Sequence, residues 1–290
     1  MYNQIDANKR KTNILFAIFF SFIIAISVFM AEYMGYGYGM VIVAFVFSMG
    51  MTWFSYYHSD KIALKTTGAR EIKQADSPYV YRMVENLCIT SGMPMPKVHI
   101  IDSPALNAFA TGRDPEHASI ALTRGIIEAL ENEELEGVIA HELSHIKNYD
   151  IRVMTVVVVL VGMISLLTDM FFRARLFGGG GDDNKNSGGA MVVIGLVLLI
   201  LSPIIANLIK LAISRKREYL ADASGALMTR YPEGLARALE KISKSSVPLK
   251  TANTATAHLF ISNPFKGSKM KSMFSTHPPI AQRIQALKEM

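Results

Sequence analysis

Four long apolar runs constrain the fold of this chain more than any other feature of its sequence. They cover residues 13–31, 38–57, 153–172 and 191–213. Each is close to the roughly 20 residues that a helix needs to cross the hydrocarbon core of a bilayer. The first two follow one another almost directly, so we expect the first to be an anchor rather than a removed signal peptide. For the last two a second interpretation stays open, in which they form a hydrophobic hairpin buried inside the protein.

Basic residues beside these runs predict how the runs are oriented. The chain carries a net charge of +6, and its Lys and Arg residues gather at 9–11, 61–73 and 215–217. Such clusters mark the cytoplasmic ends of membrane spans, so the segments that contain them are expected in the cytoplasm. A basic protein can also bind nucleic acid, but the sequence has no recognition-helix or single-strand-binding pattern. We therefore expect a lipid bilayer as a partner and no nucleic acid.

The segments between the runs predict an α+β protein that is mainly helical. Asn132 is the expected N-cap of one helix, which contains His141 and His145 and continues toward the third run. The single cysteine, Cys88, excludes a disulfide framework and a cysteine-based zinc site, and it is expected in the core. Other helices are predicted at 79–91, 125–130, 215–228, 232–241 and 279–290, and strands at 97–102 and 119–123.

This pattern predicts four consecutive parts of the chain. Residues 1–58 would form an N-terminal transmembrane hairpin, and residues 153–213 a second hairpin with a glycine-rich loop. Residues 59–152, with a small sheet, and residues 214–290 would form two cytoplasmic parts. These two parts contain the residues that can carry chemistry.

An HExxH motif at residues 141–145 predicts a zinc site. His141 and His145 are four residues apart, so on a helix they share one face and can bind one metal ion. Zinc lowers the pKa of a bound water to near neutrality, and Glu142 is placed to take its proton as general base. The alternative is a helix with two partly buried histidines and a solvated glutamate.

A catalytic zinc site needs a third protein ligand, and Glu218 is the best candidate. The two histidines precede the third apolar run and Glu218 follows the fourth, so a hairpin of these runs would bring the three together. Asp222 lies one helical turn after Glu218 and is expected to orient a ligating histidine. Taken alone, the residue type would favour the alternative, a solvated glutamate paired with a neighbouring arginine.

In these features the sequence resembles the HtpX family of membrane zinc metallopeptidases, heat-shock proteases related to the CAAX-prenyl endopeptidases. The resemblance implies a zincin-like fold with about four transmembrane helices, one zinc ion per subunit, Glu218 as third ligand and Asp222 as the partner of one histidine. It also implies a multi-pass protein of the bacterial inner membrane that clears misfolded or damaged membrane proteins under stress. It rests on two N-terminal apolar runs, NAFATG at 107–112, HELSH at 141–145, EYLAD at 218–222 and STHPP at 275–279.

Further residues are expected on the substrate side of the site. His277 precedes two prolines on an extended loop and could donate a hydrogen bond to the oxyanion, although a loop histidine is often simply exposed. Tyr219 is a weaker candidate for that role. Asn107, Ala108, Phe109 and Ala110 are expected beside the cleft, where an edge strand could pair with an extended polypeptide substrate.

The sequence therefore predicts a zinc endopeptidase that cuts cytoplasmic regions of membrane proteins. Glu142 would take the proton from the attacking water and pass it to the leaving amine. One alternative is a processing protease dedicated to a single membrane or lipidated peptide. Another is a membrane transporter with a structural zinc, which the scarcity of polar residues inside the apolar runs disfavours.

Overall fold

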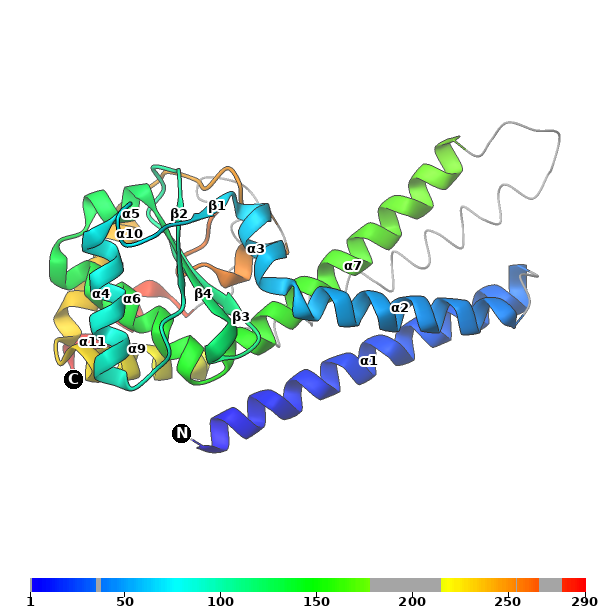
Figure 1. The fold of residues 1–290 in the computed structure, drawn as a ribbon, viewed down its shortest axis with the longest axis horizontal. Coiled ribbons are helices and arrows are strands. Elements are labelled where there is room, and N and C mark those ends of the chain that lie inside the picture. The colour runs from blue at the N-terminus through cyan, green and yellow to red at the C-terminus, as the bar shows by residue number, and fades with distance from the viewer. Residues whose placement is uncertain (1, 35–37, 178–214, 254, 266–277) are drawn as a thin grey trace.

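A computed structural model describes residues 2–34, 38–177, 215–253, 255–265 and 278–290. A rounded domain of helices and strands lies at one end, and the long helices α1, α2 and α7 project from it (Figure 1). The fourth apolar run, residues 191–213, lies outside the described residues, as does the glycine-rich loop before it.

Most of the described elements match the predicted helices and strands, but α3 and β1 were not predicted. The helices are α1 Tyr2–Met34, α2 Gly39–Tyr57, α3 Ser59–Thr67, α4 Pro78–Ser91, α5 Arg124–Ala129, α6 Asn132–Lys147, α7 Asp150–Phe177, α9 Arg215–Thr229, α10 Pro232–Lys244 and α11 Ile280–Lys288. The strands are β1 Ala69–Glu71, β2 Lys97–Ile101, β3 Ala108–Gly112 and β4 Ala118–Thr123.

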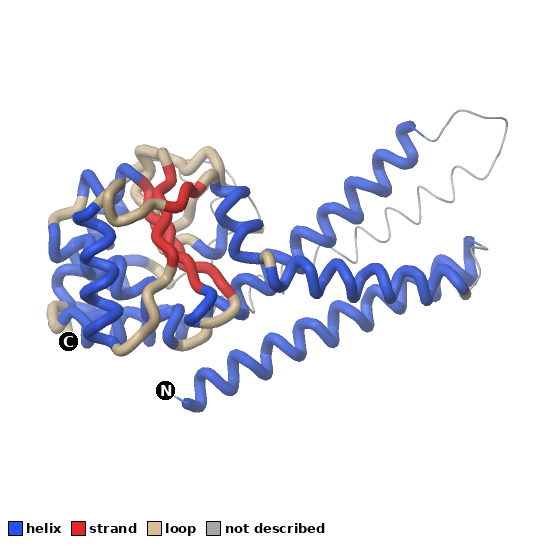
Figure 2. The backbone as a smooth tube through the Cα atoms, viewed as in Figure 1, coloured by secondary structure: helices blue, strands red, loops and turns tan. Residues whose placement is uncertain are grey.

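The four strands, red in Figure 2, form one mixed sheet. Their order in the sheet is β1-β2-β4-β3. Strands β2 and β4 are parallel, and β1 and β3 are antiparallel to their neighbours. Successive side chains point to opposite faces of a strand. In β4, Ile120 and Leu122 pack in a core cluster with residues of α4, α6 and α10, whereas Ala121 packs with Phe109 and Phe260 in another. Both faces of the sheet are therefore covered.

Helix α6 begins one residue earlier than the sequence predicts. Glu131, not Asn132, is the N-cap, with an extended backbone at φ −70° and ψ 167°. Its backbone N–H donates a hydrogen bond to the Glu134 carboxylate at 2.9 Å, as in a capping box. The capping box explains the shift, because it uses glutamates at N-cap and N3 where we expected an asparagine.

Helices α6 and α7 are separate, with a turn at Asn148 and Tyr149 between them. Tyr149 has φ 59°, in the left-handed region that non-glycine residues seldom adopt. Its N–H donates to the Ile146 carbonyl at 3.1 Å, which closes the end of α6. The turn places Asp150 at the start of α7, within reach of the last turn of α6.

No single helix among the described residues combines the length and apolar character needed to cross a bilayer. One bent pair meets the criterion jointly: Val41–Tyr57 of α2 and Ser59–Thr67 of α3, which meet at an angle of 69°.

Candidate metal centre

Helix α6 brings the two histidines of the HExxH motif together on one face. His141 and His145 are 1% and 4% exposed, and their Nε2 atoms lie 3.2 Å apart. The rings are nearly perpendicular, at 88°. Two buried imidazoles thus point nitrogen atoms at the same small volume.

Helix α9 adds the Glu218 carboxylate to this pair. Its Oε2 lies 3.8 Å from His141 Nε2, and its Oε1 lies 3.6 Å from His145 Nε2. The structure therefore brings together the three residues predicted as ligands, although 73 positions separate Glu218 from His145 in the sequence. One ligand atom from each of the three lies within 4.8 Å of the others.

A glycine makes the close approach of α9 to α6 possible. A Cβ added to Gly225 would lie 3.0 Å from the His141 backbone nitrogen and 3.2 Å from the Ala140 carbonyl carbon. Contacts this short are rare in proteins, so any side chain at Gly225 would push α9 away from α6. The distance of Glu218 from the histidines depends on this contact.

The second ring nitrogen of each histidine faces a buried aspartate. His141 Nδ1 lies 2.9 Å from Asp222 Oδ1, as expected for the partner of one histidine. His145 Nδ1 lies 3.1 Å from Asp150 Oδ2, a contact that the sequence analysis missed. A carboxylate at Nδ1 holds the proton there, which leaves the Nε2 lone pair available to a metal.

Each aspartate is held in turn by a buried arginine. Arg283 of α11 binds Asp222 through two hydrogen bonds, from Nη2 to Oδ1 at 2.6 Å and from Nε to Oδ2 at 2.8 Å. Its Nη1 lies 3.4 Å from Glu218 Oε2. Arg217 Nη1 donates to Asp150 Oδ1 at 3.4 Å. Sequence reasoning missed both arginines, because only the fold brings them to the motif.

The negative charges around His145 favour positive charge at this side chain. Burial alone would lower the pKa of His145, but its hydrogen bond to Asp150 and the charge of Glu218 raise the pKa to about 9. Burial also opposes charge on Asp222, yet the Arg283 guanidinium holds the pKa of Asp222 well below its ordinary value. For Glu142, burial dominates and raises the pKa, although both neighbouring histidines oppose it.

The geometry and charge of the cluster fit a divalent metal. Tetrahedral zinc with Zn–N bonds of about 2.0–2.1 Å places two ligand nitrogens about 3.3 Å apart, close to the observed 3.2 Å. Four buried carboxylates also surround the site against two buried guanidiniums, which leaves two negative charges for a divalent cation to balance. The carboxylates are those of Glu142, Asp150, Glu218 and Asp222, and the guanidiniums those of Arg217 and Arg283.

Comparison with known proteins agrees with this site. The sequence model described as peptidase family M48 matches residues 74–290, which include all three candidate ligands. The chain belongs to peptidase family M48. It is therefore a metalloprotease.

Two relatives of this M48 peptidase are similar along their whole length. A protein named protease HtpX homolog from Dictyoglomus thermophilum is 45% identical over 100% of this chain and 94% of the relative. Another of the same name, from Tropheryma whipplei strain Twist, is 46% identical over 100% of this chain and 98% of the relative. A solved structure, Ste24p of S. mikatae, is 18% identical with a TM-score of 0.49, and the alignment covers 99% of this chain and 67% of that one. The two HtpX homologues agree with the family resemblance that the sequence motifs indicate.

The expected substrate strand of this M48 peptidase is β3, with Asn107 just before it. Strand β3 lies at one edge of the sheet, but Asn107, Ala108, Phe109 and Ala110 are all buried. The side chain of Asn107 donates a hydrogen bond to the Ser262 carbonyl at 3.0 Å. A substrate strand could pair here only if the chain covering this edge moved.

His277 and Tyr219 were the other residues expected on the substrate side. His277 lies outside the described residues, so its role remains a prediction. The Tyr219 hydroxyl donates to Gln282 Oε1 at 3.3 Å, which ties α9 to α11.

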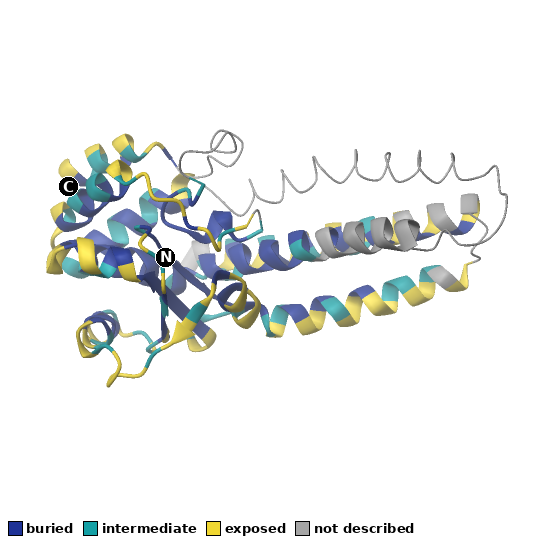
Figure 3. Ribbon diagram, turned by 90° about the horizontal axis from the view of Figure 1, so that it is seen from above, coloured by how far each residue is buried: buried dark blue, intermediate teal, exposed yellow. Residues whose placement is uncertain are grey.

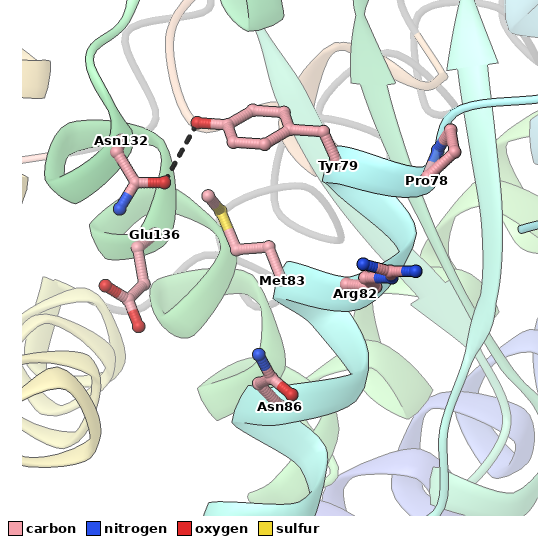
Figure 4. A pocket seen from close by; sticks show the side chains of 7 residues that line it. All are labelled: Pro78, Tyr79, Arg82, Met83, Asn86, Asn132 and Glu136. Carbon is pink, nitrogen blue, oxygen red and sulfur yellow. Dashed lines mark hydrogen bonds between the residues drawn. The ribbon is translucent and has the colours of Figure 1, made fainter.

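A cavity of about 460 Å³ lies between α4 and α6 (Figure 4). Tyr79 and Met83 of α4 line it together with Asn132 and Glu136 of α6, and the Tyr79 hydroxyl donates to Asn132 Oδ1 at 3.1 Å. His141 follows Glu136 by five residues and so lies about 140° further around the helix. This cavity does not contribute to the metal centre of the M48 peptidase.

Proposed function

We propose that this metalloprotease is a zinc-dependent endopeptidase, anchored in a membrane, that cleaves polypeptides on the cytoplasmic side. The observation that carries the proposal is the buried set of His141, His145 and Glu218, with an aspartate behind each histidine. Two imidazoles and one carboxylate are a ligand set typical of catalytic zinc, which keeps a further position open for chemistry.

Glu142 is the general base in this mechanism. When bound, zinc supplies a Lewis acid for the attacking water and the scissile carbonyl. Glu142 is adjacent to a ligand on the same helix and is 2% exposed. Burial raises its pKa, which makes its carboxylate a stronger base than an exposed glutamate, so it can take a proton from water and release it to the leaving amine.

The hydrogen-bond pattern of β3 favours Ala110 as the point where a substrate backbone pairs. The Thr123 N–H donates to the Asn107 carbonyl at 3.0 Å, so odd-numbered residues of β3 bond to β4 and even-numbered residues face the sheet edge. At this edge the Ala108 carbonyl accepts a hydrogen bond from the Ile261 N–H at 3.0 Å. Displacement of the Ile261 segment from Ala108 would let a peptide pair along this edge at Ala110, with little dependence on the peptide's sequence.

Exposed apolar side chains on α1 and α2 support membrane anchoring. Both helices project from the domain and carry exposed residues along their length (Figure 3). An exposed apolar surface of this extent is costly in water and indicates contact with another apolar phase. The large apolar residues exposed on them include Ile14, Ile18, Ile24, Val28, Ile42, Val43, Val46, Phe47, Trp53 and Phe54.

Removal of the metal should abolish cleavage by the full chain purified in detergent. We expect a chelator to reduce cleavage of an unfolded protein substrate at least about 100-fold, because water then lacks its activating Lewis acid. One equivalent of Zn²⁺ should restore cleavage after the chelator is removed. A metal-stripped enzyme that cleaved at the original rate would exclude the proposed function.

The orientation can be tested with single cysteines and a membrane-impermeant maleimide on intact spheroplasts. Native Cys88 is buried, and burial raises its pKa to about 11, so it should stay unlabelled. We expect Gly39→Cys, at the start of the second apolar run, to react on intact spheroplasts. Lys61→Cys, after the second run, should react only once the membrane is opened. Labelling of Lys61→Cys on intact cells would place the domain outside the cytoplasm.

A further inference from the structure

The N-terminal helix α1 reaches the metal centre through one buried side chain. Asn8 is 1% exposed, although it lies in the short polar stretch before the first apolar run. Its Nδ2 donates a hydrogen bond to the Asn148 carbonyl and another to Asp150 Oδ1, both at 2.9 Å. Asp150 Oδ2 is the atom that faces His145 Nδ1. A chain of hydrogen bonds thus runs from α1 to a proposed zinc ligand.

The chemistry of this contact requires an amide at position 8. A backbone carbonyl and a carboxylate both accept hydrogen bonds, and the NH₂ group of asparagine offers two donors to them. An aspartate of the same shape would instead place a carboxylate against both acceptors. Asn8 and Arg217 together occupy Asp150 Oδ1, which leaves Oδ2 for the histidine.

Neighbouring residues of α1 dock on the same turn. Lys9 Nζ lies 5.1 Å from the centre of the Tyr149 ring, in a cation–π contact. Burial lowers the pKa of Lys11, and the nearby charge of Arg217 lowers it further. Thr12, one helical turn after Asn8, is fully buried. The start of α1 is therefore packed against the protein rather than free in solvent.

We infer that Asn8 is a positioning residue of the metal centre, and that α1 is part of the catalytic unit as well as an anchor. Asn8 holds the Asp150 carboxylate in the rotamer that presents Oδ2 to His145, and so fixes the ring that binds the metal. This inference rests on the proposed zinc site. Loss of a carboxylate that orients a ligating histidine typically weakens metal binding about 10- to 100-fold, and loss of a group that positions this carboxylate should fall at the low end of that range.

The test measures zinc affinity of the full chain in detergent, by competition with a chelator. We expect Asn8→Asp to weaken zinc binding about tenfold. The matched control is Thr12→Val, which changes a buried polar residue on the same face of α1; the Thr12 hydroxyl donates only to the Asn8 backbone carbonyl at 3.0 Å. This control should bind zinc within about twofold of wild type, because it leaves Asp150 untouched.

The outcomes separate this inference from the proposed function. If wild type binds one zinc ion and Asn8→Asp binds it equally well, Asn8 only anchors α1. The inference about Asn8 is then wrong, while the proposed function stands. Equal losses of affinity in Asn8→Asp and Thr12→Val would also overturn it, because they would reflect general loosening of α1. If wild type binds no zinc, the proposed function fails as well. Should Asn8→Asp not fold, Asn8→Ala removes both donors without adding charge and is measured in the same way.

Discussion

Glu142→Gln should reduce kcat/KM for peptide cleavage about 100- to 10,000-fold while zinc remains bound in full. The amide has nearly the shape of the carboxylate but cannot accept the proton of the attacking water. The proposed ligands are untouched, so zinc content by mass spectrometry or atomic absorption should equal that of wild type. Lost cleavage with full zinc content identifies Glu142 as the general base, whereas loss of both would identify it as a ligand.

Glu136→Gln is the matched control for this variant. It makes the same change on the same helix, at a residue that lines the cavity on another side of α6. We expect its kcat/KM within about threefold of wild type, as for a residue that makes no contact with substrate. Cleavage by Glu142→Gln at the rate of this control would exclude Glu142 as the base.

Glu218→Gln should weaken zinc binding by more than about 100-fold, beyond the usual effect of an outer partner. The substitution replaces a charged ligand with a neutral amide and removes one of the buried negative charges that balance the cation. Arg283 Nη1, 3.4 Å from Glu218 Oε2, would also lose its carboxylate. Chelator competition on the purified protein measures the affinity, and cleavage at limiting zinc should fall with it.

Glu233→Gln makes the same chemical change at an exposed glutamate in the first turn of α10. Its zinc affinity should match wild type. If Glu218→Gln also bound zinc with wild-type affinity, the third ligand would be another residue and the proposed site would be wrong.

Local spacing explains why the sequence could predict the core of this site. His141 and His145 are one helical turn apart, so their proximity follows from the helix alone. Predicting that Glu218 joins them required one further assumption, that the third and fourth apolar runs form a hairpin. Strands β2 and β4 could also be predicted from local sequence, because β-branched residues alternate in β2 and β4 is a short apolar run.

The outer contacts could not be predicted, because they depend on tertiary packing. Asn8 and Asp150 are 142 positions apart, and Asp222 and Arg283 are 61 apart. No periodicity links the members of either pair. Asp150 carried only a weak signal, a lone acid at the start of an apolar helix, which helix-dipole effects alone would explain. Strand β1 has only three residues, two of them exposed, and gave no pattern at all.

The two aspartates behind the histidines accept hydrogen bonds from helices at opposite ends of the chain. Asp150 accepts one from Asn8 of α1, and Asp222 accepts two from Arg283 of α11. A ribosome that has made the HExxH helix has produced both histidines but not yet Arg283. The nascent polypeptide therefore lacks the Arg283 contact to Asp222 until α11 has been translated and has folded back.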